Sequence, residues 1–569
     1  MGVPRLFPWI LKNFTSCRKH FKEGEYNLIV ENLLLDANAI LHPCAQEVYN
    51  YGAKKSKMDR YGHLSAEQKQ LKVFTMFFDF LKTLSSIVTP TEVLYIAIDG
   101  PAPLSKQAQQ RQRRFAAALE RKDGFDSNKL TPGTPFMFEF TKFMNTAIRK
   151  EMNNPNSPWY KLKVIFSPPN VEGEGEHKLL NWIRSDPKSK FKRHCIYGPD
   201  GDLIMLTLSA HMPKIFLFRE DQYDIGYYDI LDMGQVRKNL IDVIGQRAGY
   251  ALEKRTISEV TNDFILFGFF VGNDFLPKIQ MFMYLEDGLE LMNRTYAALS
   301  KGGLQHFLSN GNKINHDGFK RFIEELARRE HNYIFDQSKP DPTKPMLDEK
   351  FKNVTLLKNI KDGKLDMIGY KKDYYLKVGI ETEDEIKQLC LDYIRCIAWV
   401  FEYYVNGLPS WRDYYAWHYA PLMTDLALTL REISKEELSY IYSFKMDKPS
   451  TPFVQLLSVL PPASSVLLPP PFRKLFKGKL NELGYYPEKF EIDLEGKTKE
   501  HMGIALLPFV DIEEIEKAYS PIFESLKNRY VRNETGRACL FQFDEKYSAK
   551  YKSEYGDIKN LKIRKTLLL

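Results

Sequence analysis

The chain has 569 residues, of which 44% are hydrophobic and 13% aromatic, so it can bury a sizeable core and form more than one domain. Its net charge of +8 suits a polyanionic partner without requiring one. No apolar run is long enough to cross a membrane, and the six scattered cysteines form no CxxC pair, which argues against a membrane protein, a zinc module and a disulfide framework.

These features predict a soluble protein in a reducing compartment. The N-terminal segment MGVPRLFPWI lacks the apolar core of a signal peptide, and Leu6 breaks the myristoylation pattern. We therefore expect an intracellular monomer that does not contact membranes, and we favour the cytoplasm over the nucleus.

Taken in chain order, five short segments predict buried strands, because they are rich in branched residues and bounded by Gly, Pro or Asp. They are Asn27–Asp36, Val93–Asp99, Lys163–Ser167, His194–Tyr197 and Lys214–Arg219. Longer helical patterns lie between them, as at Gln70–Ser86 and Lys178–Arg184. Strands that alternate with helices predict an α/β fold with a mainly parallel sheet.

Two polar stretches interrupt these patterns, and the sequence pattern changes after the second of them. Lys54–Lys69 and Pro340–Lys372 are polar and predict loops, the latter an insertion or linker. Leu389–Tyr404 predicts an aromatic, apolar helix, and Phe490–Phe509 has strand-like ends around a turn. The basic tail KNLKIRKTLLL is expected to be loosely ordered.

We therefore predict two parts. Residues 1–318 would form a catalytic domain, and residues 319–569 a mostly helical second region with a Pro-rich segment and the basic tail.

Seven carboxylates stand in short apolar contexts in the first half of the chain. They are Asp36, Asp99, Glu174, Glu176, Asp200, Asp202 and Asp274. Burying an ionised group beside apolar strands costs its hydration, and a divalent cation removes that cost. Three of these acids, Asp36, Asp99 and Asp200, lie at or just past the carboxyl ends of predicted strands, where open α/β sheets bind ligands. The pattern predicts a magnesium or manganese site.

Each acid also has a structural alternative. Asp200 and Asp202 flank Gly201 on a turn, where one of them can cap the following helix. Glu174 and Glu176 stand at a predicted helix start, where acids interact favourably with the helix dipole. Asp274 can likewise cap a helix. These alternatives stay open one by one, but they do not account well for all seven acids together.

A basic helix is predicted a few residues after Asp99. In PLSKQAQQRQRRFAAALER, the spacing of Lys106, Gln110, Arg113 and Arg114 places all four on one helix face. A face with three cations beside a metal cluster suits a phosphate held next to the ion. The alternative is an ordinary solvated charged face.

Two aromatic signals are weaker. The segment NGLPSWRDYYAWHYAPL contains Trp411 and several other rings, which can stack on bases or simply pack in the core, and we favour the core for most of them. His42 follows Asp36 and can stack on a base or bond a phosphate.

Together these segments resemble the XRN family of 5′→3′ exoribonucleases, in a compact form limited to the catalytic core. The matching segments run in family order and are MGVPRLFPW, LLLDANAILHPC, AIDGPAPLSKQAQQRQRRF, TPGTPFM, GEGEHK, YGPDGDLIML, FFVGNDFLP, SWRDYYAWHYAPL, VLPPAS and FEIDLEGK. The resemblance implies a PIN- or flap-nuclease-like sheet and assigns all seven acids to the metal site. It implies a 5′-monophosphate pocket at Lys106, Gln110, Arg113 and Arg114, base stacking by His42, and a place near the substrate path for Trp411.

The sequence departs from the family pattern at three places. Asp413 stands where a second aromatic is frequent, Ala416–Trp417 replaces a usual Pro–Tyr, and Asn38–Ala39 replaces a common Asn–Gly. These differences leave the shape of the substrate channel open.

The resemblance implies processive hydrolysis of single-stranded RNA from a 5′-monophosphate to 5′-mononucleotides with two Mg²⁺ or Mn²⁺ ions. Decapping or other processing factors would supply such ends. The alternatives are a structure-specific flap-type DNA endonuclease and a catalytically inactive RNA-binding scaffold.

Overall fold

The computed structural model describes residues 5–120, 124–221, 223–249, 252, 255–282, 284–301, 308–339, 348–497, 499–526 and 530–568. Residues 1–4 of the segment MGVPRLFPW and residues 340–347 of the predicted linker therefore lie outside the described residues.

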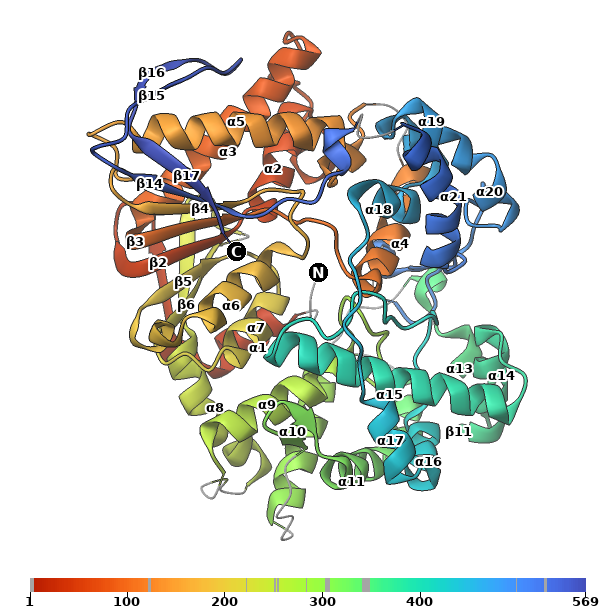
Figure 1. The fold of residues 1–569 in the computed structure, drawn as a ribbon. Helices are drawn as coiled ribbons and strands as arrows, with labels where there is room; N and C mark the ends of the chain where they lie inside the picture. The colour runs from red at the N-terminus through yellow and green to blue at the C-terminus, as the bar shows by residue number, and fades with distance from the viewer. Residues whose placement is uncertain are drawn as a thin grey trace.

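Nine strands in the described part of the chain form one central sheet (Figure 1). They are β1 Arg18–Lys22, β2 Leu28–Asp36, β3 Val88–Ala97, β4 Lys163–Ser167, β5 His194–Tyr197, β6 Ile215–Glu220, β7 Tyr227–Asp232, β14 Cys539–Phe543 and β17 Ile563–Leu567. Their order is β1-β7-β6-β5-β2-β3-β4-β14-β17. The five central strands β6, β5, β2, β3 and β4 run parallel, and the outer strands are antiparallel to their neighbours. The predicted mainly parallel sheet is confirmed.

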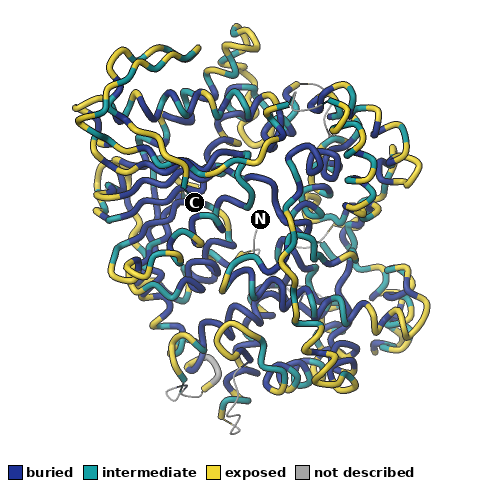
Figure 2. The backbone as a smooth tube through the Cα atoms, in the orientation of Figure 1, coloured by how far each residue is buried: buried dark blue, intermediate teal, exposed yellow. Residues whose placement is uncertain are grey.

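Helices cover both faces of this sheet, because side chains along a strand alternate between the faces. Leu33 and Leu35 of β2 pack with α2 (Asn38–Val48), α3 (Ala66–Ile87) and α5 (Pro135–Met152). Leu34 packs on the opposite face with α6 (Gly175–Ser185), α7 (Asp202–Ser209) and α8 (Met233–Ala248). The central strands are buried between these two layers (Figure 2).

The rest of the described chain is mostly helical. Its helices are α9 Ile257–Gly268, α10 Leu285–Lys301, α11 His316–Ala327, α12 Glu330–Asp336, α13 Val354–Lys358, α14 Met367–Val378, α15 Glu383–Val405, α16 Met423–Glu432, α17 Lys435–Ile441, α18 Pro452–Val459, α19 Pro470–Arg473, α20 Lys479–Glu482 and α21 Ile512–Leu526, and α1 is Leu6–Asn13. Short antiparallel pairs join some of them: β8 Ser309–Asn310 with β9 Lys313–Ile314, β10 Ile360–Lys361 with β11 Lys364–Leu365, and β12 Ile492–Asp493 with β13 Ile504–Ala505. The mostly helical second region and the helix predicted at Leu389–Tyr404 are confirmed.

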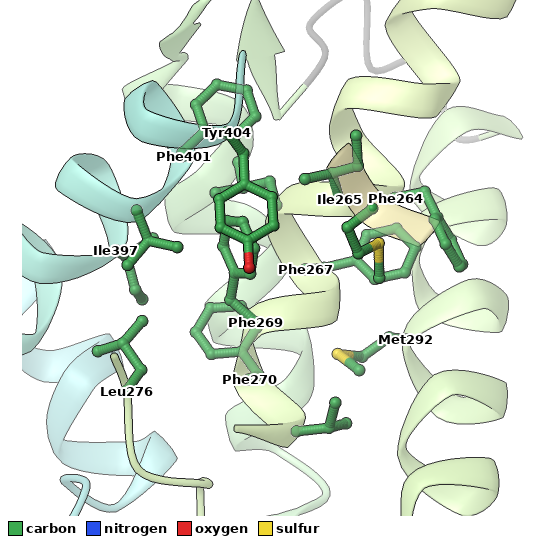
Figure 3. Packing of buried hydrophobic residues seen from close by; sticks show 14 of the residues in the cluster. Phe264, Ile265, Phe267, Phe269, Phe270, Leu276, Met292, Ile397, Phe401 and Tyr404 are labelled. Atoms are coloured by element: carbon green, nitrogen blue, oxygen red, sulfur yellow. The ribbon is translucent and has the colours of Figure 1, made fainter. Parts of the chain in front are cut away.

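One hydrophobic cluster runs from the sheet into this helical region. Figure 3 shows Phe264 and Phe267 of α9 and Met292 of α10 near Phe401 and Tyr404 of α15. The same cluster contains sheet residues, so the layers around β2 and the helices after α9 share one core. The division at residue 318 stays a prediction.

Helix α4 (Leu104–Glu120) belongs to a different packing unit. Its Leu104 and Phe115 pack with α18 and α21, and not in the two clusters that flank the sheet (Figure 1). The helix therefore leaves the sheet edge and lies against the C-terminal helices.

Two sequence predictions are wrong. The basic tail is not loosely ordered, because β16 (Ile558–Leu561) pairs with β15 (Ala549–Tyr551) and β17 joins the central sheet. The described part of Pro340–Lys372 is not a linker, because its Phe351, Leu356 and Leu365 are buried. The polar loop after residue 54 is confirmed only up to Ser65, which caps α3 through a capping box with Gln68.

All six cysteines are buried and unpaired, as expected of a chain without a disulfide framework. Among the described helices, none is long and apolar enough to span a membrane.

Candidate active site

Acidic side chains gather at the carboxyl edge of the parallel strands. Asp36 is the last residue of β2, Asp99 follows β3, and Asp200 follows β5. The N-terminus of α6 approaches the same edge, because the Gly175 amide donates to Asp99 Oδ1 at 2.7 Å. The sequence predicted three acids at this edge. In the structure, Glu174 and Glu176 at the start of α6 lie there as well.

Asp36, Asp99 and Glu176 form a close group in which one oxygen of each carboxylate lies within 4.8 Å of the others. Asp36 is buried, and its Oδ1 has no hydrogen-bond partner among the described residues. Oxygen ligands of this kind are what Mg²⁺ and Mn²⁺ prefer. The donor set therefore fits a divalent cation.

The negative charges of these acids repel one another. Burial raises the pKa of Asp36 well above its usual range, and the charges of Asp99 and Asp200 add to this, whereas Lys106 counteracts it. Burial and the nearby Glu174 and Asp36 also raise the pKa of Glu176. A bound cation would favour the ionised carboxylates and so relieve both effects.

A second acidic group surrounds Lys106 of α4. The Lys106 ammonium lies 2.7 Å from Glu174 Oε2 and 2.8 Å from Asp274 Oδ2. Burial opposes the charge of Lys106, but Asp274 and Glu174 outweigh it and raise the lysine pKa. Burial would also raise the pKa of Asp274, yet Lys106 lowers it below its usual range. Lys106 therefore serves as counterion to two predicted metal ligands.

Two tyrosines of α15 bond to the acids Glu174 and Asp202. The Tyr403 hydroxyl donates to Glu174 Oε1 at 3.0 Å, and Tyr404 bonds to Asp202. Burial and the charge of Asp274 raise the pKa of Asp202 to about 7. Neither tyrosine was predicted from the sequence as a site residue. The sequence contains a signal that could have identified them: both end an apolar helix, and a buried tyrosine needs a hydrogen-bond partner for its hydroxyl.

Lys178 was also missed. Its ammonium donates to the Ile98 carbonyl at 2.8 Å and to the Val171 carbonyl at 2.7 Å. These carbonyls belong to the loops that carry Asp99 and Glu174, so Lys178 ties the two acidic loops together.

The other predicted residues of the basic face follow Lys106 along α4. Arg113 is exposed, and Gln110 and Arg114 are half-buried. Arg114 Nη1 has no partner among the described residues, and burial together with Arg113 lowers the pKa of Arg114 to about 9. At neutral pH the guanidinium stays charged, so the face keeps an unfilled capacity to donate to an anion.

His42 lies near this face. Its ring is accessible to solvent, yet the protein around it and the charge of Arg113 lower its pKa to about 4. His42 is therefore neutral at physiological pH, which favours stacking over ion pairing with a phosphate.

Residues 1–221 match the family description "XRN 5′-3′ exonuclease N-terminus", and residues 254–362 and 358–565 match "Xrn1 helical domain". The chain belongs to the XRN family. Among curated relatives of this XRN chain, human 5′-3′ exoribonuclease 1 is 29% identical over 95% of the chain and 35% of its own length. The Schizosaccharomyces pombe 5′-3′ exoribonuclease 1 is 28% identical over 97% of the chain and 51% of its own length. The Arabidopsis thaliana 5′-3′ exoribonuclease 2 is 26% identical, over 94% and 68%.

The chain thus spans about a third to a half of the first two relatives. A solved structure of the catalytic core of Rad2 in complex with a DNA substrate aligns with 67% of the chain and 98% of that protein. The TM-score is 0.28 and the sequence identity is 12%, so the similarity is only distant.

The departures of this XRN chain from the family pattern have structural partners. Asp413 accepts from Arg395 Nε of α15 at 2.7 Å, and the Trp417 indole donates to Asp392 of the same helix at 2.8 Å. Both side chains therefore anchor the aromatic segment to α15.

The aromatic segment also approaches α4. The Trp411 carbonyl accepts the Leu104 amide at 2.8 Å, which places Trp411 beside the first turn of the basic helix. Tyr415 and Tyr419 are buried, as expected for core residues.

Proposed function

We propose that the chain is a metal-dependent 5′→3′ exoribonuclease that degrades single-stranded RNA with a 5′-monophosphate to 5′-mononucleotides. The observation that carries the proposal is the close carboxylate group of Asp36, Asp99 and Glu176 beside the helix that bears Arg113 and Arg114. Membership of the XRN family supports the direction and the RNA substrate.

Asp36, Asp99 and Glu176 would hold one Mg²⁺ or Mn²⁺ ion, and Glu174, Asp200, Asp202 and Asp274 would complete the site for a second. Bound ions of this kind activate water and stabilise the leaving oxygen. Lys178 would keep the two acidic loops in register, and Tyr403 and Tyr404 would orient Glu174 and Asp202.

The basic face of α4 would bind the terminal phosphate. Gln110, Arg113 and Arg114 would donate charge-assisted or neutral hydrogen bonds to its oxygens. Lys106 has three protons, so it can contact the phosphate while it remains near Glu174 and Asp274. After each cleavage the new 5′-phosphate can enter the same pocket, which would make the reaction processive.

His42 and Trp411 would keep the strand in register at the entrance to this pocket. The neutral ring of His42 suits stacking on the first base, and Trp411 lies beside the first turn of α4.

The test is a time course on one RNA sequence with a 5′-monophosphate, a 5′-hydroxyl or a cap, with Mg²⁺ and with EDTA. We expect rapid release of mononucleotides from the 5′-monophosphate RNA, only a slow reaction of the 5′-hydroxyl RNA, and no reaction of the capped RNA or of any RNA in EDTA. Internal cleavage of a flap DNA would instead support a flap-type endonuclease, and RNA binding without hydrolysis would support an inactive scaffold.

Arg113→Ala tests the phosphate pocket separately. Loss of one charge-assisted contact should reduce hydrolysis of 5′-monophosphate RNA about ten- to a hundred-fold and leave the slow reaction of 5′-hydroxyl RNA unchanged. The measurement is kcat/KM on both substrates. An equal fall on both would show that Arg113 does not read the phosphate.

A further inference from the structure

A second basic site lies between α5 and the C-terminal strands, and none of the seven acids lines it. An open pocket of about 490 Å³ lies where α5 meets the C-terminal strands, and its lining includes Lys142, Arg149, Lys552 and Lys565. β15 and β16 lie beside α5 in Figure 1, whereas α4 and α6 carry the candidate active site. The two sites share no residue.

The charge of this pocket is strongly positive. Four cations line it against one carboxylate, Glu554, and that carboxylate already pairs with Lys142 at 3.3 Å. Lys552 and Lys565 are exposed, and neither forms an ion pair with a carboxylate in the described part of the chain. Lys565 instead donates to Asn145 Oδ1 at 3.0 Å. The pocket therefore has ammonium groups that are not neutralised by a carboxylate and can donate to an anion.

Arg149 forms the floor. Only 8% of it is exposed, yet no carboxylate among the described residues pairs with it. Its guanidinium lies 4.5 Å from the Tyr551 ring centre and 4.9 Å from that of Phe541, and Nη1 donates to the Asn145 carbonyl at 2.7 Å. A guanidinium held between rings keeps its charge and its fixed donor geometry, which suits an anion with several oxygens.

Hydrogen bonds that do not involve the four lining cations fasten the two walls of the pocket to each other. Thr146 and Ser553 join their hydroxyls at 2.7 Å, and Lys150 donates to the Tyr555 carbonyl at 2.7 Å. These bonds fix the turn after β15 against α5. The cations are therefore held around a preformed space and are not an accidental cluster of surface lysines.

We propose that this pocket binds a backbone phosphate of the RNA outside the active site. A phosphate offers the multiple oxygens that a buried guanidinium and separate ammonium groups can share. The choice of RNA as the source of that phosphate rests on the proposed function, whereas the anion site itself rests on the pocket alone. Holding RNA here would add affinity without sequence preference.

The test compares two charge-reversal variants of the full chain. K552E/K565E alters the pocket, and K546E/K559E makes the same change of net charge at exposed lysines outside it. Binding of a fluorescent RNA of about 40 nucleotides is measured in EDTA over a range of salt concentrations. Because EDTA prevents turnover, the result does not depend on whether the chain proves to be an exoribonuclease.

We expect K552E/K565E to weaken RNA binding about five- to ten-fold more than the control, with the salt slope reduced by about one to two units. A photo-crosslinking residue in place of Lys552 should join the RNA. Pyrophosphate, titrated calorimetrically, distinguishes a free anion from RNA. Pyrophosphate binding with no effect on RNA would overturn the RNA assignment, and equal behaviour of both variants toward both ligands would overturn the pocket.

Discussion

Gly175 explains how the acids can stand so close together. A Cβ atom at this position would lie 2.8 Å from Asp36 Oδ1 and 3.3 Å from Asp99 Oδ1, so only glycine leaves room for both carboxylates. Its amide also donates to Asp99. The glycine between Glu174 and Glu176 is therefore part of the geometry of the site.

Gly175→Ala should accordingly impair catalysis more than folding. The added methyl group must displace a carboxylate, and a misplacement of about 1 Å at an active site can cost about 100-fold in rate. The measurements are RNA hydrolysis, Mn²⁺ affinity by calorimetry, and the melting temperature. We expect lower activity and weaker Mn²⁺ binding with little change in melting temperature; wild-type Mn²⁺ affinity would contradict the crowding argument.

Lys106 gives a prediction of opposite sign for the metal. In the wild type it compensates Glu174 and Asp274, so a cation that binds these acids competes with the ammonium. Lys106→Met should therefore tighten Mn²⁺ binding at the second group several-fold while RNA hydrolysis falls, because the phosphate loses a donor. Calorimetric titration measures the Mn²⁺ affinity, and an RNA hydrolysis assay measures the activity. If the affinity falls along with the activity, Lys106 does not compete with an ion.

At the residue scale, the seven acids could be predicted from the sequence. Their arrangement into a close carboxylate group and a second group around Lys106 could not. Asp36 and Asp99 follow strands with strong apolar patterns, so their shared edge is predictable. The ion pairs of Lys106 join α4 to loops 68 and 168 positions along the chain, and such pairs depend on tertiary distances that no local pattern contains. The same holds for the bond from Tyr403 to Glu174.

At the scale of elements, one buried acid joins two helices of the second region. Glu330, the first residue of α12, is fully buried and accepts from the amides of Met423 and Thr424 at the start of α16. Burial raises its pKa to about 7, although the bonds from Thr424 oppose the rise. The contact therefore satisfies amides of the first turn of α16, which have no partner within the helix.

The burial of Glu330 makes stability depend on pH. The folded state retains the Glu330 proton up to about pH 7, whereas the unfolded chain releases it near pH 4.5. The contribution of this group is therefore complete below about pH 4.5 and is lost as the pH rises to about 7, by at most about 1.4 kcal/mol per pH unit. Glu330→Gln should flatten this part of the profile at a lower overall stability. Thermal unfolding at pH 5, 6 and 7 measures the slope, and the exposed Glu436→Gln is the control that should keep it.

Buried elements could be predicted from the sequence more accurately than exposed ones. The central strands β2 to β6 are buried on both faces and read as apolar runs, so their predicted bounds differ little from the observed ones, except that β3 begins earlier, at Val88. The outer strands were missed because they alternate poorly. In β17, for example, only Ile563 is buried, and the remaining four residues are exposed. Such a strand gains its partner only through pairing with a distant segment.

At the scale of the whole molecule, the C-terminal strands complete the sheet of the N-terminal half. β14 pairs with β4 through Cys539 and Phe166, and β17 pairs with β14. Phe541 and Ile563 are buried in the same cluster as α3 and α5. The two ends of the described chain therefore depend on each other for stability, and the last strands form a wall of the basic pocket.

A charge in β17 tests this dependence. Ile563→Asp places an unpaired carboxylate in the cluster beneath the sheet, which should cost on the order of 3–5 kcal/mol and lower the melting temperature by several degrees or more. Thr566→Asp, on the exposed part of the same strand, makes the same change of charge and should have little effect. Thermal melts and the yield of soluble protein compare the two. Equal behaviour would mean that β17 does not hold the sheet. A selective loss in Ile563→Asp would show that the last strand, despite its basic and polar sequence, is a structural part of the N-terminal half.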